Sequence, residues 1–388
     1  MTGYDFSREF IAELPLARTA AAYPQIRYAD DANLGRGLFS RVGWFPTTTG
    51  QPPKTLYVLF VGTAEAIEKH GPAIADVRAL GNDLMVFEFA GQGASGRFLA
   101  DARKVHAMPD GFDMWTDSLK EFLRSDLFRA ARQRGYDHQI DVVALAYSLG
   151  GHMFARLMQE APAFSKRFTR IVYVNPVVAM NSAGTMMMRI GQQLFARFSV
   201  KEAGKSDDFV PGHGRHHPAD RPLEKSSIGS DAERHAWMCR FYKDNEHLGM
   251  WGMTYGWFHE ANRSLTKMWA IIAKGETWNP FVFLWSELRN RELPRENASR
   301  VPTLVISSQR DTIVIAHYVR RFATYIGADK LILPKAKHEP SQEPPPIREA
   351  TFDAVAAWVA NPAEPEIAET ADIKFVPRRR GMNERVKS

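Results

Sequence analysis

Short, uninterrupted apolar runs alternate with longer amphipathic segments along this chain. Such runs are typical of strands that are covered on both faces. They lie at residues 56–61, 84–89, 140–146, 169–174, 301–308 and 330–333. Phe112 to Arg134 shows the spacing of one amphipathic helix, and a further helix is expected after Ser148. Because strands and helices alternate, the pattern predicts an α/β fold with a mostly parallel sheet flanked by helices.

The alternation is interrupted once, which indicates an insertion. After Asn175-Pro176, no strand of this kind is expected until Val301. We therefore predict one core built in two parts, residues 52–175 and 291–361, with a mainly helical cap inserted at residues 176–290.

The predicted cap is rich in side chains that adapt to apolar ligands. It contains methionines at 186–188 and a set of aromatic residues: Trp237, Phe241, Trp251, Tyr255, Trp257 and Phe258. Flexible thioethers and aromatic rings suit a slot for an acyl chain. We expect most of these side chains to form the cap's own core and only a minority to face a ligand.

Composition fits this organisation. A chain of 388 residues with 45% hydrophobic content can bury one large core with an inserted lobe. The single cysteine, Cys239, excludes an intrachain disulfide, which suits a reducing compartment. The first residues lack the apolar segment of a signal peptide, and no apolar run approaches membrane-spanning length. We therefore expect a cytoplasmic protein.

The two ends of the chain lie outside the predicted core. Residues 1–51 are a lead-in, in which a run near Leu38 to Trp44 adds an edge strand, and residues 362–388 form a basic tail. The residues after Ile373 carry a net charge of +5 out of +6, so the rest of the chain is nearly neutral. This distribution argues against nucleic-acid binding. We expect a disordered, solvated tail; peripheral contact with anionic lipid at the inner membrane surface is the alternative. The oligomeric state stays open.

Residues 144–152, Ala-Leu-Ala-Tyr-Ser-Leu-Gly-Gly-His, carry the strongest chemical signal. An apolar strand runs directly into Ser148 and then into a helix, which is the pattern of a nucleophile elbow. A serine at such a turn has strained backbone geometry, and the residues two before and two after it must be small so that strand and helix can approach each other. Ala146 and Gly150 meet this requirement.

Two later strands supply the partners that a serine nucleophile needs. The strand at 301–308 ends just before Asp311, and the run at 330–333 leads to His338. Both residues therefore lie on loops at the same edge of the sheet as Ser148. A base that takes the serine proton and an acid that orients this base form a catalytic triad. We predict Ser148, Asp311 and His338 as catalytic residues.

Two other motifs do not predict a nucleotide or metal site. Gly91, Gly93 and Gly96 have the G-x-G-x-x-G spacing of a dinucleotide site, but polar loop residues follow them where such a site needs a helix. The histidines at 213, 216 and 217 lack nearby cysteines and helical spacing, so a solvated loop is the better interpretation than a metal site. We expect no cofactor and no metal.

With these residues in view, the chain resembles the α/β-hydrolase superfamily, and within it the bacterial lysophospholipase and monoacylglycerol lipase group of serine aminopeptidase-like hydrolases. The likeness extends from about Val58 to Val359. Besides the triad, it rests on several segments: 62–70 as the oxyanion loop, 91–97 as the glycine-rich loop, 230–234 and 254–257 in the cap, and His338-Glu339 with Glu343 and Ile347-Arg348. Val61, Ala90 and Ala146 depart from the common pattern, but none of them removes a proton-transfer group.

The resemblance implies hydrolysis of a small lipid ester, a lysophospholipid or a monoacylglycerol. In this hypothesis Ser148 forms an acyl-enzyme, and the backbone N–H groups of Thr63 and Leu149 bind the oxyanion. Two alternatives stay open. An aminopeptidase would need an acidic group in the cap to hold a free amine, for which Asp231, Glu246 and Glu260 are candidates. A catalytically idle binding protein on the same fold is the other.

Overall fold

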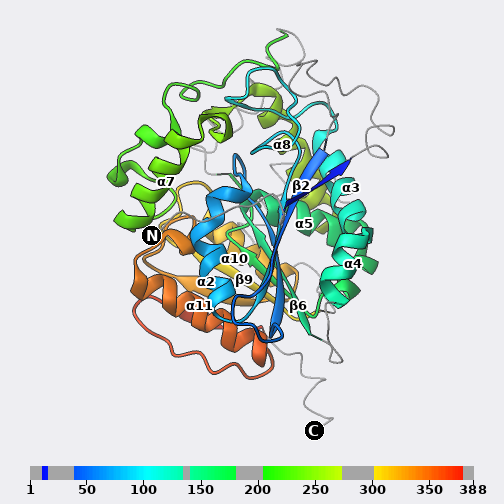
Figure 1. The fold of residues 1–388 in the computed structure, drawn as a ribbon, viewed down its shortest axis with the longest axis vertical. Helices are drawn as coiled ribbons and strands as arrows, with labels where there is room; N and C mark the ends of the chain where they lie inside the picture. The colour runs from blue at the N-terminus through cyan, green and yellow to red at the C-terminus, as the bar shows by residue number, and fades with distance from the viewer. Residues whose placement is uncertain (1–10, 16–38, 134–139, 181–203, 273–300, 379–388) are drawn as a thin grey trace, which may run out of the picture.

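A nine-stranded sheet forms the centre of the computed structural model, which describes residues 11–15, 39–133, 140–180, 204–272 and 301–378 (Figure 1). In spatial order its strands are β1 (Ile11–Pro15), β2 (Phe39–Phe45), β4 (Asp83–Glu88), β3 (Thr55–Phe60), β6 (Asp141–Tyr147), β7 (Arg170–Val174), β9 (Thr303–Ser308), β10 (Asp329–Leu333) and β11 (Lys374–Val376). The six strands from β4 to β10 pair in parallel. The pairings of β1 with β2, β2 with β4 and β10 with β11 are antiparallel.

Helices cover both faces of this sheet. Figure 1 shows α2 (Gly71–Ala79) and α11 (Pro345–Ala360) on one side, with α3 (Gly111–Arg124) and α4 (Asp126–Gln133) on the other. The remaining core helices are α5 (Ser148–Glu160), which follows β6, and α10 (Ala316–Tyr325), which follows β9. Because a parallel sheet needs cover on both faces, this arrangement explains why the strand sequences are continuously apolar.

Aromatic side chains fill the layer between the sheet and helices α3 and α5. Phe60 on β3 stacks on Phe154 of α5 with ring centroids 4.9 Å apart, and Phe87 on β4 meets Phe122 of α3 at 5.1 Å. All four side chains are fully buried. Burying each aromatic ring contributes roughly 1.5–3 kcal/mol, so this cluster holds the start of α5 firmly against the sheet.

The described part of the cap contains two α-helices, α7 (Ala232–Asp244) and α8 (Tyr255–Ile272). A small parallel pair, β5 (Lys104–Val105) with β8 (Gly252–Met253), joins a core loop to the cap. Trp257 on α8 is fully buried and packs edge-on against Phe112 of α3, with centroids 5.9 Å apart, so it belongs to the interface between cap and core. The methionines at 186–188 lie outside the described residues.

Three expectations are wrong: the length of one helix, the position of one strand in the sheet and the extent of the disordered tail. The helix expected over residues 112–134 is divided at Ser125, whose extended backbone ends α3 and whose hydroxyl accepts a hydrogen bond from Phe128 N–H in α4. The strand at 39–45 is not at the edge, because β1 pairs with it. The predicted disordered tail begins with ordered residues: Ile373 is buried and β11 pairs with β10. Residues 379–388 lie outside the described part.

Across the described residues, no helix is long and apolar enough to cross a membrane.

Candidate active site

Ser148 lies at the sharp turn where β6 ends and α5 begins. Its φ of +50° lies in the left-handed region, which costs a non-glycine residue about 1–3 kcal/mol and persists only where the surroundings enforce it. Gly150 N–H donates to the carbonyl of Val61 at 3.0 Å, and a Cβ at Gly150 would lie 2.1 Å from the carbonyl oxygen of Phe60. The close approach of strand and helix therefore requires glycine at this position.

The structure brings Ser148, His338 and Asp311 together in one chain of hydrogen bonds. His338 Nδ1 lies 2.5 Å from Asp311 Oδ2, and His338 Nε2 lies 2.9 Å from Ser148 Oγ. Because a carboxylate only accepts, Nδ1–H is the donor to Asp311, which leaves Nε2 to accept the serine O–H. All three side chains are buried, with at most 8% of each residue exposed.

The loops that carry the acid and the histidine are fixed by further hydrogen bonds. Asp311 Oδ1 accepts from the backbone N–H groups of Ile313 and Val314, at 2.7 and 3.0 Å, so that Oδ2 is directed at the imidazole. Asn175, at the end of β7, donates from Nδ2 to the carbonyl of His338 at 2.6 Å and to Ser308 Oγ at 2.9 Å. The sequence pattern indicates only that a strand ends at Asn175. Its left-handed φ of +42° explains why asparagine suits the position.

Two backbone N–H groups beside Ser148 have no hydrogen-bond acceptor among the described residues. Leu149 is at the start of α5, where helix geometry supplies no intrahelical acceptor. Thr63 follows Gly62, and a Cβ at Gly62 would lie only 3.1 Å from Ser148 Cβ, so the loop after β3 passes directly over the serine. These are the two groups that the sequence predicted as an oxyanion hole.

The family model described as serine aminopeptidase, S33, matches residues 51–345. The chain belongs to the S33 family. The predicted membership in the lysophospholipase and monoacylglycerol lipase-like group of α/β-hydrolases is thereby confirmed.

Curated relatives of this S33 protein are similar over part of their length. Lysophospholipase L2 of Escherichia coli K12 is 24% identical over 231 residues, which cover 59% of this chain and 62% of that protein. The chain therefore matches less than two thirds of this relative. The probable lysophospholipase L2 of Haemophilus influenzae is 22% identical over 269 residues, covering 68% of this chain and 77% of the relative.

Solved structures share the fold of this S33 protein at low sequence identity. A soluble variant of monoglyceride lipase from Saccharomyces cerevisiae aligns with a TM-score of 0.59 and 14% identity, over 86% of this chain and 94% of that one. The monoacylglycerol lipase of Paleococcus ferrophilus aligns with a TM-score of 0.52 and 13% identity, over 82% and 97%. The fold predicted from the sequence is confirmed.

A buried cluster of charges lies between the two loops of this S33 site. Lys69 Nζ binds the carboxylate of Glu65 and, at 2.9 Å, Glu339 Oε2, while His70 Nε2 lies 3.1 Å from Glu65 Oε2. Burial alone would raise the pKa of Glu65, but Lys69 and His70 hold that pKa well below its usual value. Glu65 is therefore ionised and accepts the N–H of Gly62 at 2.6 Å.

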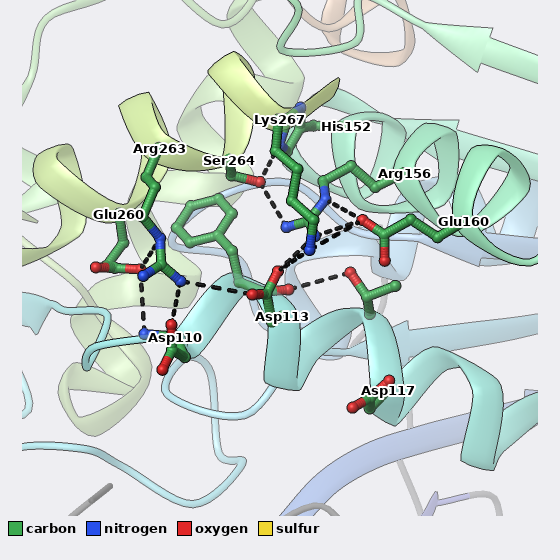
Figure 2. Close-up of polar contacts among 12 residues, drawn as sticks. Asp110, Asp113, Asp117, His152, Arg156, Glu160, Glu260, Arg263, Ser264 and Lys267 are labelled. Carbon is green, nitrogen blue, oxygen red and sulfur yellow. Dashed lines mark hydrogen bonds and ion pairs between the residues drawn. The ribbon is translucent and has the colours of Figure 1, made fainter. Parts of the chain in front are cut away.

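Helix α8 of the cap is bound to the helix that begins at Ser148 (Figure 2). Arg156 of α5 is fully buried, donates to Ser264 Oγ of α8 at 2.9 Å and pairs with Asp113 of α3. His152, one turn after Ser148, also meets Ser264 Oγ at 2.7 Å; burial, then Arg156, lowers the pKa of His152 to about 3, so this imidazole is neutral at pH 7. Lys267 of α8 reaches Asp113 at 3.1 Å.

The three acids considered for binding a free amine occupy different surroundings. Asp231 caps α7 by accepting Arg234 N–H at 2.8 Å and also meets Arg348, at 3.4 Å. Glu260 is buried between Asp110 N–H and Arg263, as Figure 2 shows. Glu246 is exposed. The two buried or half-buried acids thus already have partners within the protein.

The glycine-rich loop and the histidines at 213 and 217 have structural roles. The glycine-rich loop wraps around a carboxylate: Ser95 N–H and Oγ both donate to Glu88 Oε1, at 2.8 and 2.7 Å. A loop that solvates a buried anion of its own does not offer the same N–H groups to a phosphate. His213 Nδ1 accepts Met253 N–H, and His217 Nδ1 accepts Ala219 N–H. No group of three or more potential metal ligands occurs among the described residues.

Proposed function

We propose that this S33 family member is a serine hydrolase that cleaves carboxylic esters through an acyl-enzyme. The observation that carries the proposal is the hydrogen-bonded series Ser148–His338–Asp311 at the turn between β6 and α5. The same constellation of a hydroxyl, an imidazole and a carboxylate activates serine nucleophiles on several unrelated folds.

In the proposed reaction, His338 Nε2 takes the proton of Ser148 as Oγ attacks the ester carbonyl carbon. The carbonyl oxygen becomes negative and accepts hydrogen bonds from the N–H groups of Thr63 and Leu149, which have no other acceptor among the residues described. When the tetrahedral intermediate collapses, Nε2–H protonates the leaving alcohol. Water then attacks the acyl-enzyme by the same route, and its proton again passes through Nε2.

We further propose a lipid ester with one acyl chain, a lysophospholipid or a monoacylglycerol, as the substrate. Similarity to proteins named lysophospholipase L2 supports this choice. The cap supports it as well, because the part described packs on the core beside α5, where it could cover an apolar chain bound at Ser148.

The first experiment is labelling with a fluorophosphonate, which reacts only with an activated serine. We expect the wild-type protein to be labelled at Ser148 and Ser148→Ala to be unlabelled while keeping its melting temperature. A wild-type protein that is correctly folded yet unreactive would favour the idle binding protein and overturn the proposal. The control is Ser165→Ala, which alters a half-buried serine in the turn after α5 whose hydroxyl donates to the carbonyl of Pro162.

A substrate panel then decides between ester and amide chemistry. Lysophosphatidylcholine, monoacylglycerol and aminoacyl amides are compared at equal concentration with the same enzyme preparation. We expect hydrolysis of one or both lipid esters. Preferential cleavage of the aminoacyl amide would instead establish an aminopeptidase, the activity named in the description of the family model.

A further inference from the structure

The side chain of Gln92 is buried in the loop after β4 and reaches across to the loop that passes over Ser148. Its Nε2 donates to the carbonyl of Gly62 at 2.8 Å, and its Oε1 accepts the N–H of Ala64 at 3.1 Å. One planar amide thus holds the residue before Thr63 and the residue after it. Only 2% of Gln92 is exposed.

The conformation of the glycine-rich loop directs Gln92 inward. Gly91 and Gly93, its two neighbours, have φ values of +91° and +54°. A Cβ at Gly91 would lie 2.3 Å from the ring of Phe98, and a Cβ at Gly93 would lie 2.1 Å from Glu88 Oε2. Glycine is therefore required on both sides of Gln92 for steric as well as conformational reasons.

The polar backbone groups around Thr63 are occupied in a consistent pattern. Gly62 N–H donates to Glu65 Oε2 at 2.6 Å, while Gly62 C=O and Ala64 N–H both bind Gln92. Ala64 has a φ of +62°, a strained value for a residue with a side chain. The N–H of Thr63, between them, has no acceptor among the described residues. The two side chains thus hold the loop in a strained form that leaves this one donor unused.

We propose that Gln92 is a positioning residue, which holds the loop of Gly62 to Glu65 so that the Thr63 N–H meets the negative oxygen of the transition state. This inference rests on the proposed ester hydrolysis. An oxyanion donor stabilises the transition state only when it is held in place before the charge develops. A side chain amide suits the task because it carries a donor and an acceptor in one rigid plane. Glutamate would offer two acceptors and no donor for the carbonyl of Gly62. Methionine would offer neither the donor nor the amide acceptor.

The test uses the full-length chain with Gln92→Met, which keeps the length of the side chain and removes both hydrogen bonds. Ser95→Ala is the matched control, because Ser95 is in the same loop and equally buried but bonds Glu88 instead of the oxyanion loop. For each variant we measure kcat and KM on a soluble ester, the inhibition constant of an alkyl boronic acid and the melting temperature. The boronate forms a tetrahedral adduct with serine and so reports on oxyanion binding.

Loss of a positioned donor lowers kcat on the order of 10²-fold, so we expect a decrease of about this size for Gln92→Met, with KM changed by no more than about twofold. The boronate inhibition constant rises in step with the loss of kcat/KM. We expect Ser95→Ala to retain kcat within about threefold of the wild type, even if its melting temperature falls as much as that of Gln92→Met. Loss of folded protein alone would also lower the apparent kcat at unchanged KM, but it would leave the boronate inhibition constant unchanged. The rise of that constant therefore distinguishes a misplaced oxyanion donor from a smaller folded fraction.

Two results would overturn the inference. In one, Gln92→Met hydrolyses the ester with wild-type kcat; in the other, Ser95→Ala loses as much kcat and boronate affinity as Gln92→Met does. If Gln92→Met does not fold, Gln92→Glu replaces it, since that variant keeps the acceptor for Ala64 N–H and loses the donor to Gly62 C=O. A wild-type protein without esterase activity or fluorophosphonate labelling would reject the proposed function itself, whereas an active wild type with an equally active Gln92 variant rejects only this inference.

Discussion

Lys69 and Glu339 form a buried ion pair at 2.9 Å although 270 positions separate them in the chain. Glu339 directly follows His338, and Lys69 also binds Glu65 at the end of the loop over Ser148. The pair therefore joins the loop that carries the histidine to the loop that carries the Thr63 N–H. Two carboxylates share one lysine in this cluster. Loss of Lys69 would therefore leave both carboxylates without its positive charge.

We expect Lys69→Met to lower the free energy of unfolding by about 3–5 kcal/mol, because it leaves two carboxylates in a buried site without their cation. Urea denaturation followed by tryptophan fluorescence measures this. Lys120→Met, which removes the half-buried pair with Asp117, serves as the control and should cost less than about 1 kcal/mol. Equal losses in the two variants would contradict the role given to Lys69.

Asp311→Asn should lower kcat by about 10⁴-fold with a small effect on KM, because an amide no longer enforces the tautomer of His338 in which Nε2 accepts. The two backbone N–H groups that bind Asp311 Oδ1 can still bind the amide oxygen, so the fold should be retained. Steady-state kinetics and circular dichroism check the two halves of this prediction. Loss of less than tenfold in kcat would mean that Asp311 is not the orienting acid.

Asn175→Asp keeps the shape of the side chain but replaces its donor with a carboxylate facing the carbonyl of His338. We expect the variant to lose about 1–3 kcal/mol of stability, because the carbonyl is buried and its partner is removed. Activity should fall as well, since misplacement of a catalytic group by about 1 Å can cost on the order of 10²-fold. The control is Asn361→Asp at the end of α11, and the prediction fails if the two variants behave alike.

The stability of the contact between α3 and α8 should depend on pH through Glu260. Burial, opposed by Arg263, raises the pKa of Glu260 from its ordinary 4.5 to about 7. Between these values the native state holds a proton that the unfolded state has released, so the free energy of unfolding falls as pH rises from 4.5 to 7.

Glu260→Gln removes this dependence and keeps an acceptor for Asp110 N–H. The free energy of unfolding of the variant minus that of the wild type should be greater at pH 8 than at pH 4, by on the order of 2 kcal/mol. Urea denaturation at the two pH values measures the difference. If the gap between variant and wild type does not change with pH, Glu260 ionises normally in the native protein.

Gly150→Ala should destabilise the protein severely, because the new Cβ would lie 2.1 Å from a backbone carbonyl oxygen that cannot move aside. We expect a loss of at least about 2–3 kcal/mol and loss of fluorophosphonate labelling. Gly111→Ala is the matched control in a helix: its Cβ would meet only Ala107 Cβ, at 3.4 Å, and ordinary helix propensity favours alanine. Thermal unfolding of both variants tests the comparison.

The parallel strands and the three residues of the proposed triad could be predicted because each depends on a local pattern. A continuous apolar run predicts a buried strand, and parallel strands deliver their following loops to one edge. The position of Ser125 shows the limit of such patterns, since a hydroxyl that caps the next helix ends an otherwise regular amphipathic run.

Other parts of the site depend on contacts that no local pattern encodes. Gln92 was expected only as part of a glycine-rich loop, and its role depends on how the loop after β4 lies beside the loop after β3. Glu339 was noted only as part of a family pattern, and its partner Lys69 lies in another region of the chain. Asn175 likewise joins three segments that meet only in the folded protein.

The antiparallel strands β1 and β11 are the two edge strands of the sheet, at its opposite ends. A parallel sheet without them would end in open backbone donors and acceptors, which readily recruit strands from other molecules. A shortened protein that stops at residue 361 would expose β10 in this way. Its tendency to self-associate would then increase for reasons unrelated to the charge that the truncation removes.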